Sequence, residues 1–432
     1  MDLPLELLEL IFQKITLTHN LMNCRATCRS WRKVANAVFT SELPLMLSLS
    51  PSKTPYNSYY PVKSEEPNLA SLSAPWSNDD ESSTVLTGTW PQAIDPSDII
   101  RVQSVQGWLM FNKFHHVIDQ DKTFCELSFF NPFSRARFKL PWLFLFSGSP
   151  CHYQVRVVFN SAPPGSEDFV VVFLCVFCYK DKKRFIIAPE DMKQRLAFIK
   201  FKRGSWIESI LETNDILYDI VLADKDDKLY ALTLEHETSV VLVLTLGHGE
   251  DQHDLGIERL VLLNTVKDTY VCRCILTDAY YKRRHQLAID TSTGELLLVH
   301  HDTGNSTQFG CYQSICTKGF RVFKLERSVL RWCEVFDIGN RILLWDYTRV
   351  SIVSTKGLIL PEQFKGGNCI FFCHANTLWN MRGEGRFRFQ DHDMGVFFLA
   401  DRTITHFPNN SSLSFSLQNM WFTPARPAPN HN

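Results

Sequence analysis

From about residue 99 to about residue 410, the sequence alternates short apolar runs with polar turns. This alternation limits the possible folds more than any other feature. The runs are rich in β-branched and aromatic residues, as in Phe169–Leu174 and Leu196–Phe201. Many follow a polar turn such as Asp224–Asp227 or Asp290–Gly294. A two-sheet sandwich would use only part of these strands. We therefore expect a large all-β domain, most simply a degenerate β-propeller of roughly six to eight blades.

Two tryptophan-containing segments suggest the repeat. Ser205–Glu208 and Arg331–Glu334 each place a Trp before an apolar or thiol residue and then Glu, so we expect equivalent strands in different blades. No double-glycine kelch repeat accompanies them, and Trp345-Asp346 is a single match to the Trp-Asp repeat. These tryptophans could instead fill the core of a β-sandwich, which stays the alternative fold.

The first 40 residues have a helical pattern. Pro4 suits the first turn of a helix, where its missing N–H has no partner to lose. Leu8, Ile11, Phe12 and Ile15 follow at three- and four-residue spacing. Apolar residues continue this pattern over three expected helices: Leu3, Leu7, Leu21, Cys28, Trp31 and Val34. A unit this short cannot close a core, so its apolar face must pack on the rest of the chain or on another protein.

The order of these residues resembles an F-box. The resemblance rests on Leu3-Pro4, Leu7-Leu8, Ile11-Phe12 and Cys28–Arg32. It implies docking to a Skp-type adaptor and, through it, to a cullin. The adaptor-binding residues that it implies are Leu3, Pro4, Leu7, Leu8, Ile11, Phe12, Ile15, Leu21, Cys28, Trp31 and Val34. Thr18-His19 stands where the family usually has an acidic residue opening the second helix, a departure that would weaken adaptor binding.

The rest of the chain resembles plant F-box proteins that carry a kelch-like, KIB-type β-propeller. The matching motifs occur in the family order: Gly107-Trp108, Asn131–Arg135, Leu140-Pro141, Asp227–Leu232, Val322–Leu325, Ile338–Arg341 and Gly367–Phe372. The resemblance implies a substrate-recognition subunit of a Skp/cullin/F-box ubiquitin ligase. In such a protein the propeller binds a protein substrate, and the chain itself has no catalytic residue.

These patterns divide the chain into four parts. Residues 1–40 form the F-box, and residues 41–98 hold a first strand near Leu43–Leu49 followed by Ser- and Pro-rich loops. Residues 99–410 form the propeller. Residues 411–432 are rich in Pro and polar residues, and we expect a disordered tail.

Composition restricts the partners and the compartment. The formal charge is −1, with 45 basic and 46 acidic side chains, so no global field favours nucleic acid or an anionic membrane. No apolar stretch approaches the ~18 residues of a membrane span, and no secretory signal is evident. The 13 scattered cysteines then indicate reduced thiols in the cytoplasm or nucleus.

Three groups of residues resemble functional sites but have simpler interpretations. Cys175 and Cys178 have zinc-ligand spacing, but at odd separation within a strand they point to opposite faces, so no metal or cofactor is expected. A propeller hydrolase would need converging carboxylates, for which Asp391 and Asp393 are the densest candidates. Both carboxylates are interpreted as turn residues preceding a strand.

The basic run 282–285 is interpreted as a hairpin tip. Two alternatives to the ligase receptor stay open: a propeller that inhibits a partner such as a kinase by occlusion, and a hydrolase.

Overall fold

The computed structural model is almost entirely β-sheet. It describes residues 7, 31, 45–49, 70–73, 84–85, 101–105, 108–131, 136–148, 152–160, 162, 168–178, 192–202, 205–211, 217–223, 228–234, 239–245, 256–261, 285–309, 312–346, 349–356, 358, 360–378, 388–407 and 418–422. Within this part of the chain, no helix is long and apolar enough to cross a membrane. Two short 3₁₀ turns, η3 (Ile118–Gln120) and η6 (Glu362–Phe364), interrupt the strands.

The described strands form six sheets. The first three, in chain order, contain these strands: β1 (Leu45–Leu49), β2 (Ala70–Ser73), β3 (Thr84–Val85) and β26 (Gln418–Phe422); β4 (Arg101–Val105), β5 (Trp108–Val117), β6 (Lys122–Phe130), β7 (Arg137–Lys139) and β8 (Leu143–Ser147); β9 (His152–Phe159), β10 (Val170–Cys178), β11 (Met192–Lys202) and β12 (Ser205–Leu211). Their pairing orders are β26-β1-β2-β3, β4-β5-β6-β7 with β8 also on β6, and β12-β11-β10-β9.

The other three sheets complete the domain. They contain these strands: β13 (Leu217–Ala223), β14 (Lys228–Leu234), β15 (Ser239–Thr245) and β16 (Gly256–Val261); β17 (His285–Ile289), β18 (Leu296–Phe309), β19 (Tyr312–Glu326) and β20 (Arg331–Val335); β21 (Arg341–Asp346), β22 (Val350–Ser354), β23 (Cys369–Leu378), β24 (Arg388–Phe398) and β25 (Ile404–His406). The first two pair in chain order, and the last has the order β22-β21-β23-β24-β25.

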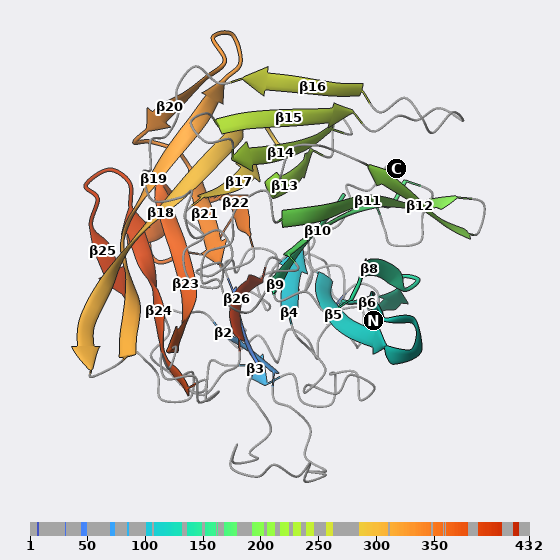
Figure 1. Cartoon of the computed structure of the whole chain (residues 1–432). Helices are drawn as coiled ribbons and strands as arrows, with labels where there is room; N and C mark the ends of the chain where they lie inside the picture. Colours follow the sequence, from blue (N-terminus) through green and yellow to red (C-terminus); the bar gives the residue numbers. More distant parts are fainter. Residues whose placement is uncertain are drawn as a thin grey trace.

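The six sheets follow one another around a ring, as the colours of Figure 1 show. Successive sheets touch through the strands at one edge of each sheet: β9 contacts β13, β13 contacts β17 and β17 contacts β22. β26 contacts both β4 and β21, so the last strand of the chain lies between the second and the sixth sheet. This arrangement is a β-propeller, and it confirms the predicted all-β body.

The ring is closed by strands from its two ends. β26 pairs antiparallel with β1, from Leu45 opposite Phe422 to Leu49 opposite Gln418. The expected contents of two segments are therefore wrong. The segment 411–432 includes a strand rather than only a tail, and the segment 41–98 includes β2 and β3 besides the expected first strand. The partner of β26 lies at the other end of the sequence, so no local pattern marks it as a strand.

The sixth sheet departs from the simple up-and-down order. β21 pairs antiparallel with β22 but parallel with β23, so the connection from β22 to β23 begins and ends at the end of the sheet where β21 starts. The starts of β21 and β23 therefore lie side by side. This brings together two sequence motifs, Ile338–Arg341 and Gly367–Phe372, which are separated along the chain.

The predicted equivalence of the two Trp-containing segments is confirmed. Ser205–Glu208 begins β12 and Arg331–Glu334 begins β20, and each is the fourth and outermost strand of its sheet. The core lies between the sheets: Leu287, Leu296 and Trp332 of the fifth sheet pack on β14 and β15, whereas its Val322 packs on the sixth sheet. Alternating strand residues thus serve two neighbouring interfaces.

Candidate functional site

The predicted adaptor-binding residues lie almost entirely outside the described residues. Leu7 and Trp31 are the exceptions. Both have helical backbone, Leu7 is 47% exposed, and Trp31 is partly buried. The three expected helices and the adaptor contacts of Leu3, Pro4, Leu8 and the other residues named with them remain predictions.

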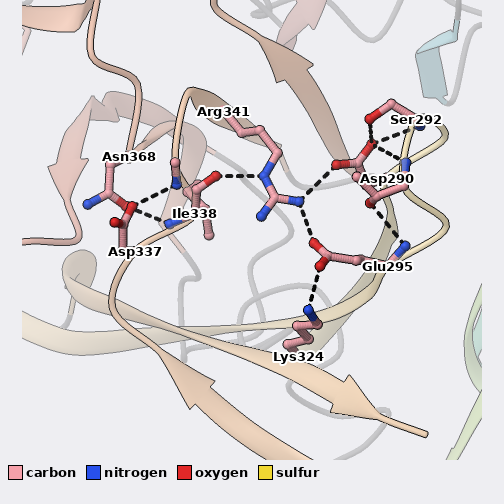
Figure 2. Close-up of polar contacts among 10 residues, drawn as sticks. Asp290, Ser292, Glu295, Lys324, Asp337, Ile338, Arg341 and Asn368 are labelled. Carbon is pink, nitrogen blue, oxygen red and sulfur yellow. Dashed lines mark hydrogen bonds and ion pairs between the residues drawn. The ribbon is translucent and has the colours of Figure 1, made fainter.

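The most connected polar cluster among the described residues joins the fifth and sixth sheets at Arg341 (Figure 2). Its Nη1 donates to Asp290 Oδ2 at 2.8 Å and to Glu295 Oε2 at 2.7 Å, and its Nε donates to the carbonyl of Ile338 at 2.6 Å. Lys324 on β19 holds Glu295 from the other side. We call Asp290, Glu295, Lys324 and Arg341 the Arg341 cluster. It ties the β17–β18 turn to the first residue of β21.

The Asp290–Gly294 turn is built to present a carboxylate. Asp290 Oδ1 accepts from the Ser292 backbone N–H at 2.8 Å and from its hydroxyl, which leaves Oδ2 for Arg341. Gly294 takes φ of +75°, a conformation that favours glycine, and its N–H donates to the Asp290 carbonyl at 2.7 Å. The sequence prediction of a turn at this position is confirmed.

A second group of hydrogen bonds at the start of β21 lies around Asn368, on the other side of Arg341 in Figure 2. Its side-chain oxygen accepts from the Ile338 N–H at 2.9 Å, and its backbone N–H donates to the carbonyls of Gly339 and Arg341 at 3.0 and 2.8 Å. Gly367 precedes it with φ of +69°, and a Cβ there would lie 2.7 Å from the backbone nitrogen of Arg341. The close approach of the two strand starts therefore requires glycine at this position.

The ionisation of the Arg341 cluster matches its geometry. Burial alone would raise the pKa of Asp290, but the hydrogen bonds from Ser292 and Arg341 outweigh it and lower the pKa to about 2. The hydrogen bond from Lys324 lowers the pKa of Glu295, with a further contribution from Arg341. Every charge in the cluster is thus matched by a neighbour on an adjacent element. The arrangement fixes one sheet to the next and leaves no carboxylate poised for proton transfer.

Another ionic group runs along the outer edge of the same two sheets. Glu334 on β20 accepts from Arg321 Nε and Nη2 at 3.0 and 2.7 Å, and from Arg402 of the β24–β25 turn at 3.0 Å. The Arg402 guanidinium also lies 5.0 Å from the centre of the Phe336 ring. Half of the Arg402 and Phe336 side chains is exposed, so this group is far more solvated than the Arg341 cluster.

Buried polar side chains connect the first strands of four successive sheets. Arg156 on β9 lies 3.2 Å from Asp219 on β13, and both are almost fully buried. The second oxygen of Asp219 accepts from the Leu287 N–H on β17 at 2.8 Å. Gln286 next to it donates to the Asp346 carbonyl of β21 at 3.2 Å. These contacts cross from sheet to sheet where the first strands meet, and they fix the relative position of the blades.

The cysteines and carboxylates considered for chemistry have structural surroundings. Among the described residues, no group of three or more His, Cys, Asp or Glu side chains is placed to hold a metal ion. Cys369 and Cys373 are buried thiols on β23, and burial raises the pKa of Cys369 to about 12. Cys175 is likewise a buried thiol, in the cluster between the second and third sheets.

The interpretation of Asp391–Asp393 as turn residues is wrong, because all three lie inside β24. His374 on β23 is the cross-strand partner of Asp393. The Asp393 carboxylate is buried, accepts from the Thr317 N–H of β19, and has His406 Nδ1 at 3.3 Å. Three consecutive polar residues are typical of a turn, although here they lie inside a strand. The last of them, Asp393, connects the fifth sheet to the sixth through its contact with β19.

Trp142 is an exposed aromatic that the sequence analysis did not single out. It lies between β7 and β8, with 53% of its surface exposed, and stacks on His115 of β5. The only local signal was its place directly after the Leu140-Pro141 motif. Exposure could not be inferred there, because Trp is usually a core residue.

Comparison with known families identifies both parts of the chain. Residues 77–398 match the model of the KIB1-4 β-propeller, which covers well over half of the sequence. Residues 1–39 match the F-box-like domain model. The chain therefore belongs to the KIB1-4 β-propeller family and carries an F-box-like domain at its N-terminus. The resemblance seen in the sequence is confirmed. No curated protein matches the chain.

Solved structures show a weak likeness. The nidogen/laminin complex is 8% identical with a TM-score of 0.35, and the match covers 89% of this chain and 99% of that one. The acylaminoacyl peptidase of Pyrococcus horikoshii is 8% identical with a TM-score of 0.34, covering 88% of this chain and 54% of that one. The Trypanosoma rangeli sialidase is 8% identical with a TM-score of 0.28, covering 71% and 47%. Likeness of this size adds nothing to the family assignment.

Proposed function

We propose that this protein is the substrate-recognition subunit of a Skp/cullin/F-box ubiquitin ligase. The observation that carries the proposal is the presence of an F-box-like domain and a KIB1-4 β-propeller in one chain. The F-box docks the Skp-type adaptor, and through it the cullin. The propeller binds a protein substrate and presents it for ubiquitination. Catalysis by the chain is then proximity alone, since a bound substrate has a high local concentration near the ubiquitin-carrying enzyme.

The structure of the propeller supports a binding role. Its polar clusters are committed to joining sheets, as at Arg341, Asp219 and Asp393. Such joints make a rigid platform, and rigid platforms suit recognition because little entropy is lost on binding. The described cysteines are thiols outside any disulfide, which supports action in the reducing cytoplasm or nucleus, and we include this in the proposal.

Co-expression of the full chain with a Skp-type adaptor, followed by size-exclusion chromatography, tests this proposal. We expect a one-to-one complex. Leu8→Asp and Ile11→Asp each place a charge in the proposed apolar interface and should abolish the complex while the propeller stays folded. Leu229→Ala, a core change far along the chain, is the matched control and should weaken stability without preventing docking.

The opposite outcome is equally informative. A folded, monodisperse chain that ignores the adaptor, or a complex that survives both Asp variants, would contradict the docking assignment. The protein would then be a propeller interaction module that acts on its partner by occlusion.

A further inference from the structure

A pair of buried histidines lies between the fourth and fifth sheets. His285 is the first residue of β17, and His300 lies directly opposite it on β18. Their side chains point toward the fourth sheet, because Leu287 and Leu298, two residues along on the same strands, pack on that sheet. Of the two residues, 5% of His285 and 6% of His300 is exposed. The proposed function gives neither ring a role.

The two rings contact each other through nitrogen atoms. His300 Nδ1 lies 3.2 Å from His285 Nε2, and the ring centres are 4.6 Å apart with 48° between the planes. A hydrogen bond between two nitrogens needs one donor and one acceptor. Either nitrogen can be the donor, depending on the tautomers, but both cannot carry a proton while the contact is kept. This requirement holds whatever the outer nitrogen of each ring contacts.

This contact limits the number of protons that the folded pair can bind. An imidazolium carries a proton on both nitrogens, so one imidazolium can donate to one neutral imidazole. Two imidazolium rings would lose the hydrogen bond and place two positive charges against each other in a buried site. The folded pair therefore takes up at most one extra proton while the contact persists. The unfolded chain has no such limit, and each of its two rings takes up a proton independently.

The elements packed against the first strand of the pair contribute few titratable groups. Both β13 and β22 contact β17. β22 has no titratable side chain from Val350 to Ser354. On β13 the titratable residues are Tyr218 and Asp219. Asp219 accepts from the Leu287 N–H at 2.8 Å with one oxygen, and its other oxygen lies 3.2 Å from Arg156 Nε, so this carboxylate is engaged by both neighbours.

The groups beside the second strand of the pair also leave this limit in place. On β19, Arg321 lies opposite His300, and its Nε and Nη2 donate to Glu334 of β20. A cation in this position opposes a second positive charge on the pair. Asp302, two residues beyond His300 on β18, is exposed, so water screens its charge. His301 between them has its side chain on the other face of the sheet.

We propose that the His285–His300 pair is a pH-sensitive contact that weakens the packing of the fifth sheet on the fourth as the solution becomes acidic. An unfolded histidine has a pKa of about 6.5, so both rings of the unfolded chain gain a proton between about pH 7 and pH 5. The folded pair gains fewer protons over the same range. By linkage, the free energy of unfolding is then highest near pH 7 and falls as the pH falls toward 5.

Urea unfolding of the full chain at pH 7, 6 and 5, followed by circular dichroism, tests this inference. The variants are His285→Gln and His300→Gln, each of which keeps one ring and puts an uncharged hydrogen-bonding side chain in place of the other. Between pH 7 and pH 5, the ratio of folded to unfolded wild type should fall about tenfold more than that of either variant. This factor follows from the one proton that the folded pair does not bind.

His116→Gln is the matched control. His116 is an exposed histidine on the second sheet, and its Nδ1 lies 3.1 Å from the Thr123 hydroxyl instead of a second ring. This variant should keep the pH profile of the wild type. Parallel pH profiles for the wild type, His285→Gln and His300→Gln would overturn the inference.

A second measurement on the wild type covers the case in which a variant does not fold. Hydrogen–deuterium exchange at the imidazole Cε1–H, followed by mass spectrometry, reports the protonation of each histidine in the folded chain. At pH 5 the two rings together should carry no more than one extra proton, and two protonated rings would overturn the inference. Both measurements use the chain without the adaptor, so failure of docking would leave this result standing.

Discussion

The Arg341 cluster and the surroundings of Trp142 contain similar residues in different roles. Each contains basic side chains around a carboxylate held by a lysine. In the Arg341 cluster a second carboxylate completes the balance, and the group connects two sheets. Around Trp142, Lys139 and Glu126 belong to one sheet, and the aromatic ring, which stacks on His115, is left half exposed. The first arrangement joins two sheets, whereas the second lies at the surface of one sheet.

Removing one large aromatic side chain near each region should give the largest contrast. Phe364, in the connection that carries Gly367, is 2% exposed, and Phe364→Ala should lower the free energy of unfolding by about 3–5 kcal/mol because it leaves a cavity. Trp142→Ala should lower it by less than about 1.5 kcal/mol, since half of that ring is already in water. Urea unfolding followed by circular dichroism measures both. Similar losses would erase the distinction between the two regions.

Arg341→Met should produce the next largest effect. The change keeps the apolar stem but leaves Asp290 and Glu295 without their shared partner, and it removes the donor to Ile338. We expect a loss of about 2–3 kcal/mol in the free energy of unfolding, at the lower end for a buried pair because the group is partly solvated. Asp290→Asn with Arg341→Met, compared with the single variants, gives the coupling energy. Additive losses would mean that the two side chains act independently.

Acid should weaken the contact between the fifth and sixth sheets at the Arg341 cluster. The pKa of Asp290 is about 2 in the folded chain and near 3.8 when unfolded, so its contribution is complete above about pH 5 and is lost progressively as the pH falls toward 2. The difference corresponds to about 2 kcal/mol. Asp290→Asn should therefore show a flatter stability profile between pH 5 and pH 3 than the wild type. Parallel profiles would assign the acid sensitivity to other carboxylates.

The smallest effect is expected at the solvated edge. Arg402→Met removes one contact to Glu334 and the cation above Phe336, but Arg321 still binds Glu334 through two nitrogens. Because the Arg402 side chain is 53% exposed, we expect a change within about 0.5 kcal/mol. A loss comparable to that of Arg341→Met would show that exposure is a poor guide to the role of these ionic groups.

The sequence was informative where the determinants are local. Strand alternation, the Asp290–Gly294 turn and the equivalence of the two Trp-containing outer strands all follow from neighbouring residues. The motifs Ile338–Arg341 and Gly367–Phe372 could be recognised, but their meeting depends on the parallel pairing of β21 with β23, which neither motif encodes alone. Asp393 was misinterpreted because its hydrogen-bond partner lies on β19, in another sheet. The exposure of Trp142 depends on how the elements pack, and no local pattern marks it.

The pairing of β1 with β26 has a mechanical consequence. Leu45, which follows the F-box-like domain, lies directly opposite Phe422, the last described residue of the chain. A pull that holds the F-box and draws on the C-terminus therefore acts on both strands from the same end. In that geometry the hydrogen bonds between them break one after another from Leu45–Phe422 toward Leu49–Gln418, instead of resisting together as they would in shear. The pairing of β1 with β26 is therefore loaded in the unzipping direction, and tension applied through the C-terminus would open the ring at this pair first.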